Sequence, residues 1–154
     1  MTITEYNPYN EGKDHINIYS RSKTKLGVSL SNFALSPFVH PIHGLFNSVE
    51  GFYYWLSTGK SNDELRKLYG FRAKEEGKKY KVLPIENFDQ QIAEAIEYKI
   101  EQNQYIKDEL INSDLPFTHY YCYGDFDNYK IVKSKTGDWL VSIIEEIRNK
   151  LKRD

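Results

Sequence analysis

The spacing of apolar residues along the chain predicts three helices. Between Phe88 and Ile111, apolar side chains recur at steps of three and four residues, which is the spacing of one face of an α-helix. The same spacing recurs from Asp138 to Leu151. A shorter helix is expected from Val49 to Leu56, with Ser48 as its N-cap. These segments predict a chain that is mostly helical.

The remaining segments predict shorter elements. Ile16–Ser20 has a strand-like composition, and the aromatic run His119–Tyr123 indicates a strand or an extended segment. His40–Gly44 contains a proline and a glycine and is expected to form a turn. Short helices are expected over Asp63–Tyr69 and over residues 73–77.

Length and polarity fit one globular domain. The chain has 154 residues, of which 40% are hydrophobic and 28% are charged. We therefore expect a compact α+β domain over residues 16–154, mostly helical with a few short strands. Residues 1–15 are polar and show no periodicity, so they are expected to form a flexible N-terminal leader and not a signal peptide.

Charge and cysteine content argue against several classes of function. The 21 Lys and Arg residues are balanced by 22 Asp and Glu residues, which does not favour tight, sequence-independent binding to long DNA. Cys122 is the single cysteine, so an internal disulfide is excluded and a reducing, cytoplasmic setting is the simplest interpretation. The longest apolar run, Phe52–Leu56, is far too short to cross a bilayer, and no membrane partner is expected.

Two familiar motifs are incomplete. Gly59-Lys60-Ser61 resembles the end of a phosphate-binding P-loop, but Tyr54 stands where that motif requires its first glycine. His40 and His43 are separated by Pro41 and lack an obvious carboxylate or thiolate partner, so no metal site is expected there.

A carboxylate with neighbouring aromatic residues is the pattern that could carry chemistry. Glu50 lies in the first turn of the predicted helix 49–56, where the helix N-terminus favours an ionised carboxylate. Tyr53 and Tyr54 follow three and four residues later and share its side of the helix. This arrangement suits hydrolysis of a sugar–base bond, in which rings hold the substrate and the carboxylate stabilises an oxocarbenium-like centre or activates water. Helix electrostatics and core packing would equally explain the same residues.

Several segments, taken in order, resemble a known family. They are Ile18–Ser20, Ser31–Ala34, Pro37–Phe38, Phe46–Tyr53, Lys74–Gly77, Ala95–Asn103, Tyr123–Asp125 and Leu140–Arg148. In order and spacing they resemble the NADAR (NAD- and ADP-ribose-associated) proteins, the YbiA-like N-glycosidases, from about residue 16 to residue 150. The resemblance implies a compact, mostly helical α+β fold.

The resemblance also implies an enzyme, an N-glycosyl hydrolase similar to ADP-ribosyl glycohydrolases. Its substrate would be an ADP-ribosyl or phosphoribosyl adduct: either ADP-ribose on guanine bases of nucleic acid, or a riboflavin-pathway ribosylamine. No metal or redox cofactor is expected, because leaving-group protonation and charge stabilisation suffice. The alternatives are a non-catalytic module that binds ADP-ribose or a nucleotide, and a purely structural helical domain. Size and the Lys, Asn and Tyr bias would suit a phage or bacterial protein, and the oligomeric state stays open.

Residue by residue, the resemblance assigns Glu50 and Asp125 as the catalytic carboxylates, which we expect to share one cleft. The candidate substrate-binding residues are Asn32, Phe33, Tyr53, Tyr54, Lys60, Tyr123 and Gly124. Four positions depart from the family pattern: Tyr54 stands for a frequent Gln, Ser57 for a Lys, Tyr123 for a Trp that precedes Gly-Asp, and Asp138 for an Asn. Lys60 is expected to replace the missing lysine. These departures predict either an unusual substrate or binding without turnover.

Overall fold

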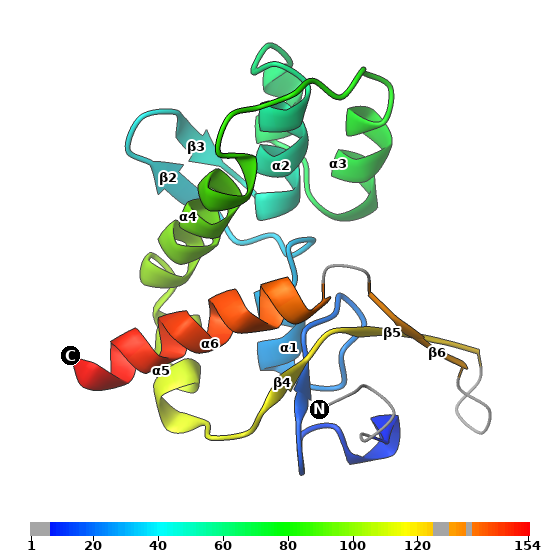
Figure 1. The fold of residues 1–154 in the computed structure, drawn as a ribbon, viewed down its shortest axis with the longest axis vertical. Coiled ribbons are helices and arrows are strands. Elements are labelled where there is room, and N and C mark those ends of the chain that lie inside the picture. The colour runs from blue at the N-terminus through cyan, green and yellow to red at the C-terminus, as the bar shows by residue number, and fades with distance from the viewer. Residues whose placement is uncertain (1–6, 125–129, 135–136) are drawn as a thin grey trace. The chain divides into compact units, whose positions relative to one another are not determined.

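The computed structural model describes residues 7–124, 130–134 and 137–154 and has a mostly helical α+β fold with short strands (Figure 1). The chain divides into two compact units. We call residues Asn32–Tyr105 the central unit, and Met1–Ser31 together with Ile106–Asp154 the terminal unit. No helix within the described residues is long and apolar enough to cross a membrane.

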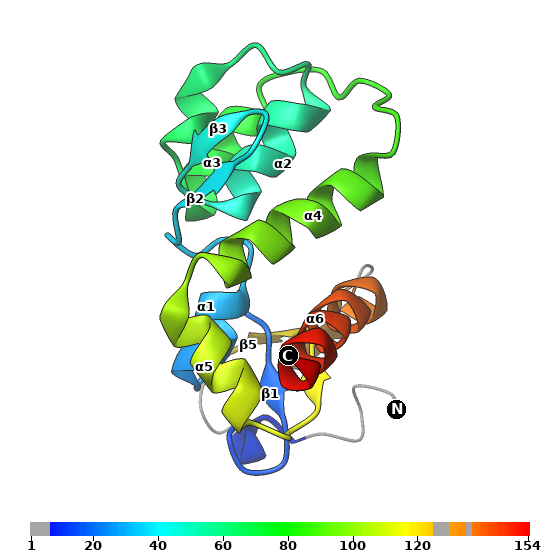
Figure 2. The same cartoon turned by 90° about the vertical axis from the view of Figure 1, so that its left-hand side faces the viewer.

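The central unit consists of a β-hairpin packed with four helical segments. Its elements are β2 (Phe38–His40), β3 (Gly44–Phe46), α2 (Val49–Ser57), the 3₁₀ helix η3 (Asp63–Arg66), α3 (Gly70–Gly77) and α4 (Phe88–Glu101). The strands are antiparallel, with Phe38 opposite Phe46, and the hairpin lies beside α2 (Figure 2). Both phenylalanines contact the buried ring of Phe52 on α2. This aromatic cluster forms the core of the hairpin and α2.

The terminal unit combines the two ends of the chain. Its elements are the 3₁₀ helix η2 (Pro8–Asn10), β1 (Ile16–Asn17), α1 (Lys25–Leu30), β4 (Phe117–Thr118), β5 (Tyr120–Tyr123), β6 (Lys130–Lys133) and α6 (Gly137–Arg153). α5 (Gln104–Asn112) begins at the boundary between the two units. β1 pairs with β4 in parallel, and β5 pairs with β6 antiparallel. The apolar stripe expected on the last helix is buried, as the exposures of Leu140, Ile144 and Ile147 show.

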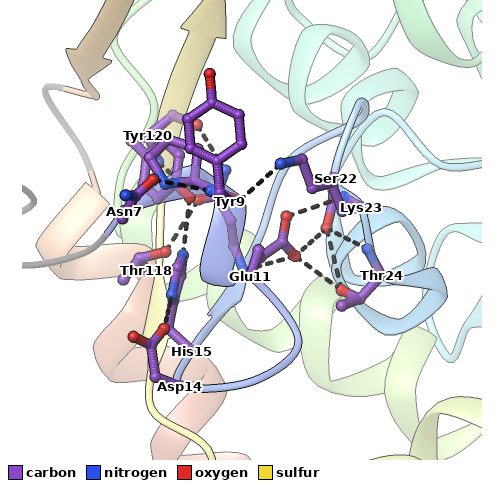
Figure 3. Close-up of polar contacts among 12 residues, drawn as sticks. Asn7, Tyr9, Glu11, Asp14, His15, Ser22, Lys23, Thr24, Thr118 and Tyr120 are labelled. Atoms are coloured by element: carbon purple, nitrogen blue, oxygen red, sulfur yellow. Dashed lines mark hydrogen bonds and ion pairs between the residues drawn. The ribbon is translucent and has the colours of Figure 1, made fainter. Parts of the chain in front are cut away.

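A polar network orders the segment that precedes β1. The Glu11 carboxylate faces the loop that leads to α1 and accepts hydrogen bonds from the Ser22 and Thr24 hydroxyls and from the Lys23 backbone N–H (Figure 3). His15 is fully buried and lies 2.8 Å from the Tyr120 hydroxyl. The expected leader over residues 1–15 therefore has defined structure in its second half, because buried polar groups there find partners in other segments.

The predicted helix Phe88–Ile111 is wrong in one respect, because two helices occupy this stretch. α4 ends at Glu101 and α5 begins at Gln104. At the break, the Gln102 side-chain amide accepts a hydrogen bond from the Val39 N–H (2.8 Å) and donates one to the Val39 carbonyl (2.9 Å). The Asn103 amide donates to the Ser36 hydroxyl (3.0 Å). These contacts hold the chain at the break, while the apolar spacing continues on both sides of it.

The predicted helix Asp63–Tyr69 is also shorter in the structure. Only the 3₁₀ helix η3 forms, and α3 begins at Gly70. The carbonyls of Lys67 and Leu68 accept hydrogen bonds from the side chains of Asn47 (3.0 Å) and Ser48 (2.8 Å). Because these carbonyls bond to the segment that leads into α2, they do not continue a helix.

The stability of each unit is expected to depend strongly on one buried isoleucine. Ile100 in the central unit and Ile144 in the terminal unit have 0% exposure, so replacing either with alanine should lower the free energy of unfolding by about 2–5 kcal/mol. Ile111 is 42% exposed, and Ile111→Ala is the matched control, with an expected loss below about 1 kcal/mol. Urea denaturation measures all three variants. Equal losses for Ile100→Ala and Ile111→Ala would contradict this assignment of the core.

Candidate active site

The beginning of α2 is held by two neighbouring segments. The Ser48 hydroxyl caps the helix by accepting from the Gly51 N–H (2.9 Å), as the sequence predicts. The Glu50 N–H donates to the Asn32 carbonyl (2.9 Å). The carbonyl of the next residue, Phe33, accepts from the Gly70 N–H at the start of α3 (3.0 Å). The segment 32–33 therefore links the first turns of α2 and α3 through its backbone.

Glu50 has an unusual environment for a carboxyl group in a first helical turn. Burial raises its pKa from 4.5 to about 7, although the charges of Lys74 and Lys78 on α3 act in the opposite direction. The loss of solvation thus outweighs the attraction of both cations and of the helix N-terminus. The sequence analysis had expected the helix N-terminus to favour the ionised form. Near neutral pH Glu50 is present in both protonation states. It can therefore donate a proton as well as accept one.

Tyr53 and Tyr54 share the side of α2 that carries Glu50. Burial raises the pKa of both hydroxyls, and the Glu50 charge raises them further, to about 12 for Tyr54. Their rings are 5.1 Å apart, and the Tyr53 ring also lies 5.1 Å from that of Phe88 on α4. Both phenols therefore stay protonated at neutral pH and offer hydrogen-bond donors next to the carboxyl group.

Tyr54 packs directly on the last residue of α3. A Cβ atom added to Gly77 would lie 2.1 Å from Cγ of Tyr54, closer than any two such atoms can approach. The absence of a side chain at residue 77 therefore sets the separation of α2 and α3 beside Glu50.

Gly77→Ala is expected to lower the free energy of unfolding by about 1–3 kcal/mol, because the Tyr54 ring must move out of a packed position. Helix propensity alone predicts a gain of up to about 1 kcal/mol, so the sign of the change separates the two effects. Glu75→Ala, at an exposed position of the same helix, is the control and should change little. Thermal and urea unfolding measure both. A stabilised Gly77→Ala variant would rule out the close contact.

Asn32 contributes an unsatisfied acceptor near Glu50. Its side-chain oxygen Oδ1 is buried and has no hydrogen-bond partner in the described part of the chain. A buried acceptor without a partner costs about 1–3 kcal/mol, and a ligand that donates a hydrogen bond would remove this cost. The neighbouring Phe33 ring lies 5.1 Å from the ring of Phe71 on α3, edge to face.

The other expected site residues lie elsewhere. Lys60 follows the C-terminal end of α2, in a left-handed conformation, and its charge acts on His40 and His43. Glu50 lies in the first turn of α2 and Lys60 follows its last turn, so the two residues lie at opposite ends of this helix. Tyr123 and Gly124 lie at the end of β5 in the terminal unit. Asp125 lies outside the described residues, so the shared cleft of Glu50 and Asp125 stays a prediction.

His40 and His43 have structural surroundings. His40 Nδ1 accepts hydrogen bonds from the N–H groups of Ile42 (3.0 Å) and His43 (3.2 Å) and so closes the hairpin turn. Burial, followed by the neighbouring charges, lowers the pKa of both imidazoles. Among the described residues, no group of three or more His, Cys, Asp or Glu side chains is placed to hold a metal ion.

The departures from the family pattern have ordinary partners. Ser57 is buried, and its hydroxyl donates to the Tyr54 carbonyl (3.4 Å). Asp138 lies in the first turn of α6 and forms an ion pair with Lys133 (3.5 Å).

The sequence analysis assigned no role to three lysines that could be functional. Lys74 and Lys78 are the cations that act on Glu50. Lys99, on α4, is fully buried, and burial lowers its pKa to about 7, so that part of it is a neutral amine at neutral pH. The sequence could have indicated that Lys99 is buried, because this lysine occupies a position at which the apolar spacing of Phe88–Ile111 places core residues.

Comparisons with known proteins show the fold. No protein-family model matches the chain, and no curated protein matches it significantly. Among solved structures, the NMR structure of the Escherichia coli protein YbiA is similar, with a TM-score of 0.64 and 20% sequence identity. The similarity covers 90% of this chain and 84% of the YbiA chain. The chain therefore has a YbiA-like α+β fold.

Proposed function

We propose that this chain is an N-glycosidase of the NADAR type, which hydrolyses the bond between a phosphate-bearing ribose and a nitrogen atom. The observation that carries the proposal is Glu50, a partly buried carboxyl group with a pKa of about 7 in a YbiA-like fold. Such a group is matched to proton transfer at neutral pH, whereas an ordinary glutamate is almost fully ionised there. Strongly shifted carboxyl groups are characteristic of active sites.

In the proposed reaction, protonated Glu50 donates its proton to the leaving nitrogen. The electron pair of the C1–N bond moves to that nitrogen, and positive charge develops at C1 and the ring oxygen of the ribose. A water molecule adds to C1 and loses a proton to a base, and the products are the free sugar and the free base. Asp125 is the expected base, by resemblance to the family.

The neighbours of Glu50 fit the handling of a ribosyl group. The unpartnered Asn32 Oδ1 would accept a hydrogen bond from a ribose hydroxyl or from an amino group of the base. The rings of Phe33, Tyr53 and Tyr54 would enclose the sugar and reduce its contact with water. A more apolar surrounding strengthens the effect of the Glu50 carboxylate on the cationic transition state.

A binding module without turnover is the second candidate. It is favoured by the departures from the family pattern at Tyr54, Ser57 and Asp138. A YbiA-like fold with altered contacts could retain ADP-ribose binding and lose hydrolysis.

One experiment separates the two functions. The protein is incubated with an oligonucleotide that carries ADP-ribose on guanine and, separately, with a riboflavin-pathway ribosylamine, and the released sugar is measured by mass spectrometry. The N-glycosidase proposal expects release from at least one substrate. Calorimetric binding of ADP-ribose without release from either substrate would instead establish the binding module.

A further inference from the structure

One face of α3 presents an exposed ring and two lysines toward the region of Glu50. Phe71, Lys74 and Lys78 follow one another at steps of three and four residues and so lie on the same side of the helix. The charges of both lysines act on Glu50. α2 and α3 lie side by side in both views (Figure 1, Figure 2), in agreement with the packing of Tyr54 on Gly77.

These two lysines differ from the next one along the chain. Within the described residues, neither Lys74 nor Lys78 has an ion pair or a side-chain hydrogen bond. Lys79, by contrast, pairs with Glu76 at 3.0 Å. Two like charges one helical turn apart repel each other. An anionic ligand would remove this repulsion.

An exposed ring and an unsatisfied acceptor lie at the start of α3. Phe71 is 64% exposed, and its ring contacts that of Phe33. The Gly70 N–H bond to the Phe33 carbonyl holds this ring pair together. The residue before Phe33 is Asn32, whose buried Oδ1 has no partner in the described part of the chain. An exposed flat ring and an unsatisfied acceptor thus lie at the first turns of α3 and α2, and the two cations lie in the last turn of α3 and at the residue that follows it.

We propose that Lys74 and Lys78 form a phosphate-binding site for the ligand whose ribose reaches Glu50, with Phe71 as a stacking surface for its base. This inference rests on the proposed function and adds residues that bind the phosphate side of the substrate. Lysines are point charges suited to phosphate oxygens. At i and i+4, their Cβ atoms are about 6 Å apart, which lets both ammonium groups reach adjacent phosphates.

Two sources of phosphate fit this site, the diphosphate of an ADP-ribosyl group and the backbone of a nucleic acid. Pyrophosphate, ADP-ribose and an unmodified single-stranded oligonucleotide are therefore titrated separately into the wild-type protein and followed by calorimetry and NMR. The same titrations are repeated with Lys74→Gln/Lys78→Gln. Lys79→Gln, which removes a lysine that is already paired, is the matched control.

The double variant is expected to bind pyrophosphate and ADP-ribose at least about 10-fold more weakly, while Lys79→Gln binds nearly as the wild type does. Loss of oligonucleotide binding in the same variant would assign the nucleic-acid backbone as a source; unchanged oligonucleotide binding would assign the diphosphate. Phe71→Ala should weaken ADP-ribose but not pyrophosphate. Thermal unfolding checks that the variants are folded.

Wild-type protein that binds none of the three probes, or a folded double variant that binds them as tightly as the wild type, would overturn the phosphate site. Because these titrations need no turnover, they are independent of the hydrolysis assay. Sugar release without Lys74- and Lys78-dependent binding refutes the phosphate site alone. Pyrophosphate binding without sugar release refutes the hydrolase and leaves the phosphate site standing.

Discussion

Glu50→Gln is expected to slow the release of sugar about 10²-fold or more and to leave the affinity for ADP-ribose nearly unchanged. Glutamine retains the size and the hydrogen-bonding reach of the side chain, but it can neither donate the acidic proton nor carry the charge. If Glu50 acts mainly in the transition state, the loss falls on the chemical step and not on binding. Single-turnover release from an ADP-ribosylated guanine oligonucleotide measures the rate, and calorimetry measures the binding of ADP-ribose.

The pH dependence of the wild-type rate tests which role Glu50 has. A general acid must be protonated, so the rate should fall as the pH rises through about 7, the pKa of Glu50 in the folded protein. A rate that rises over the same range would assign Glu50 as a base. Glu86→Gln removes an exposed carboxyl group from the same unit and should keep the wild-type rate. A Glu50→Gln variant as fast as this control would exclude Glu50 from the mechanism.

Glu50→Gln is also expected to be more stable than the wild type at neutral and higher pH. The folded pKa of Glu50 is raised from 4.5 to about 7, so between these values the folded protein holds a proton that the unfolded chain has released. Wild-type stability therefore falls as the pH rises from 4.5 to 7, by up to about 3 kcal/mol, and the neutral glutamine lacks this loss. The variant also lacks the negative charge that stabilises the helix N-terminus, but this loss lowers its stability by only about 0.3–1 kcal/mol.

Urea denaturation of both proteins at several pH values measures this difference. The two should have similar stability below about pH 4, and the variant should gain progressively until about pH 8. Lys99, whose pKa is lowered by burial, makes the folded state more stable as the pH rises from about 7, but it is present in both proteins and cancels in the comparison. A variant that is less stable than the wild type at pH 8 would mean that Glu50 is solvated and merely stabilises the helix N-terminus.

Short-range features of this protein could be predicted from its sequence. α2 and its Ser48 cap, and the buried stripe of α6, follow from residues within a few positions of each other. The placement of Glu50 in a first helical turn with Tyr53 and Tyr54 beside it is local in the same sense. Backbone hydrogen bonds and side-chain spacing within one helix are sufficient to specify such features.

The tertiary structure decided everything that depends on segments distant in the sequence. The break between α4 and α5 is held by Gln102 on the backbone of Val39, 63 residues earlier. The sequence favoured an ionised Glu50, but burial in the folded protein outweighs the helix N-terminus. Lys60 follows α2 closely in sequence but lies beyond its far end, whereas Lys74 on α3 and Lys78 just after it act on Glu50. Solvation and charge act through space, so the sequence determined which groups are available, and only the fold determined which of them meet.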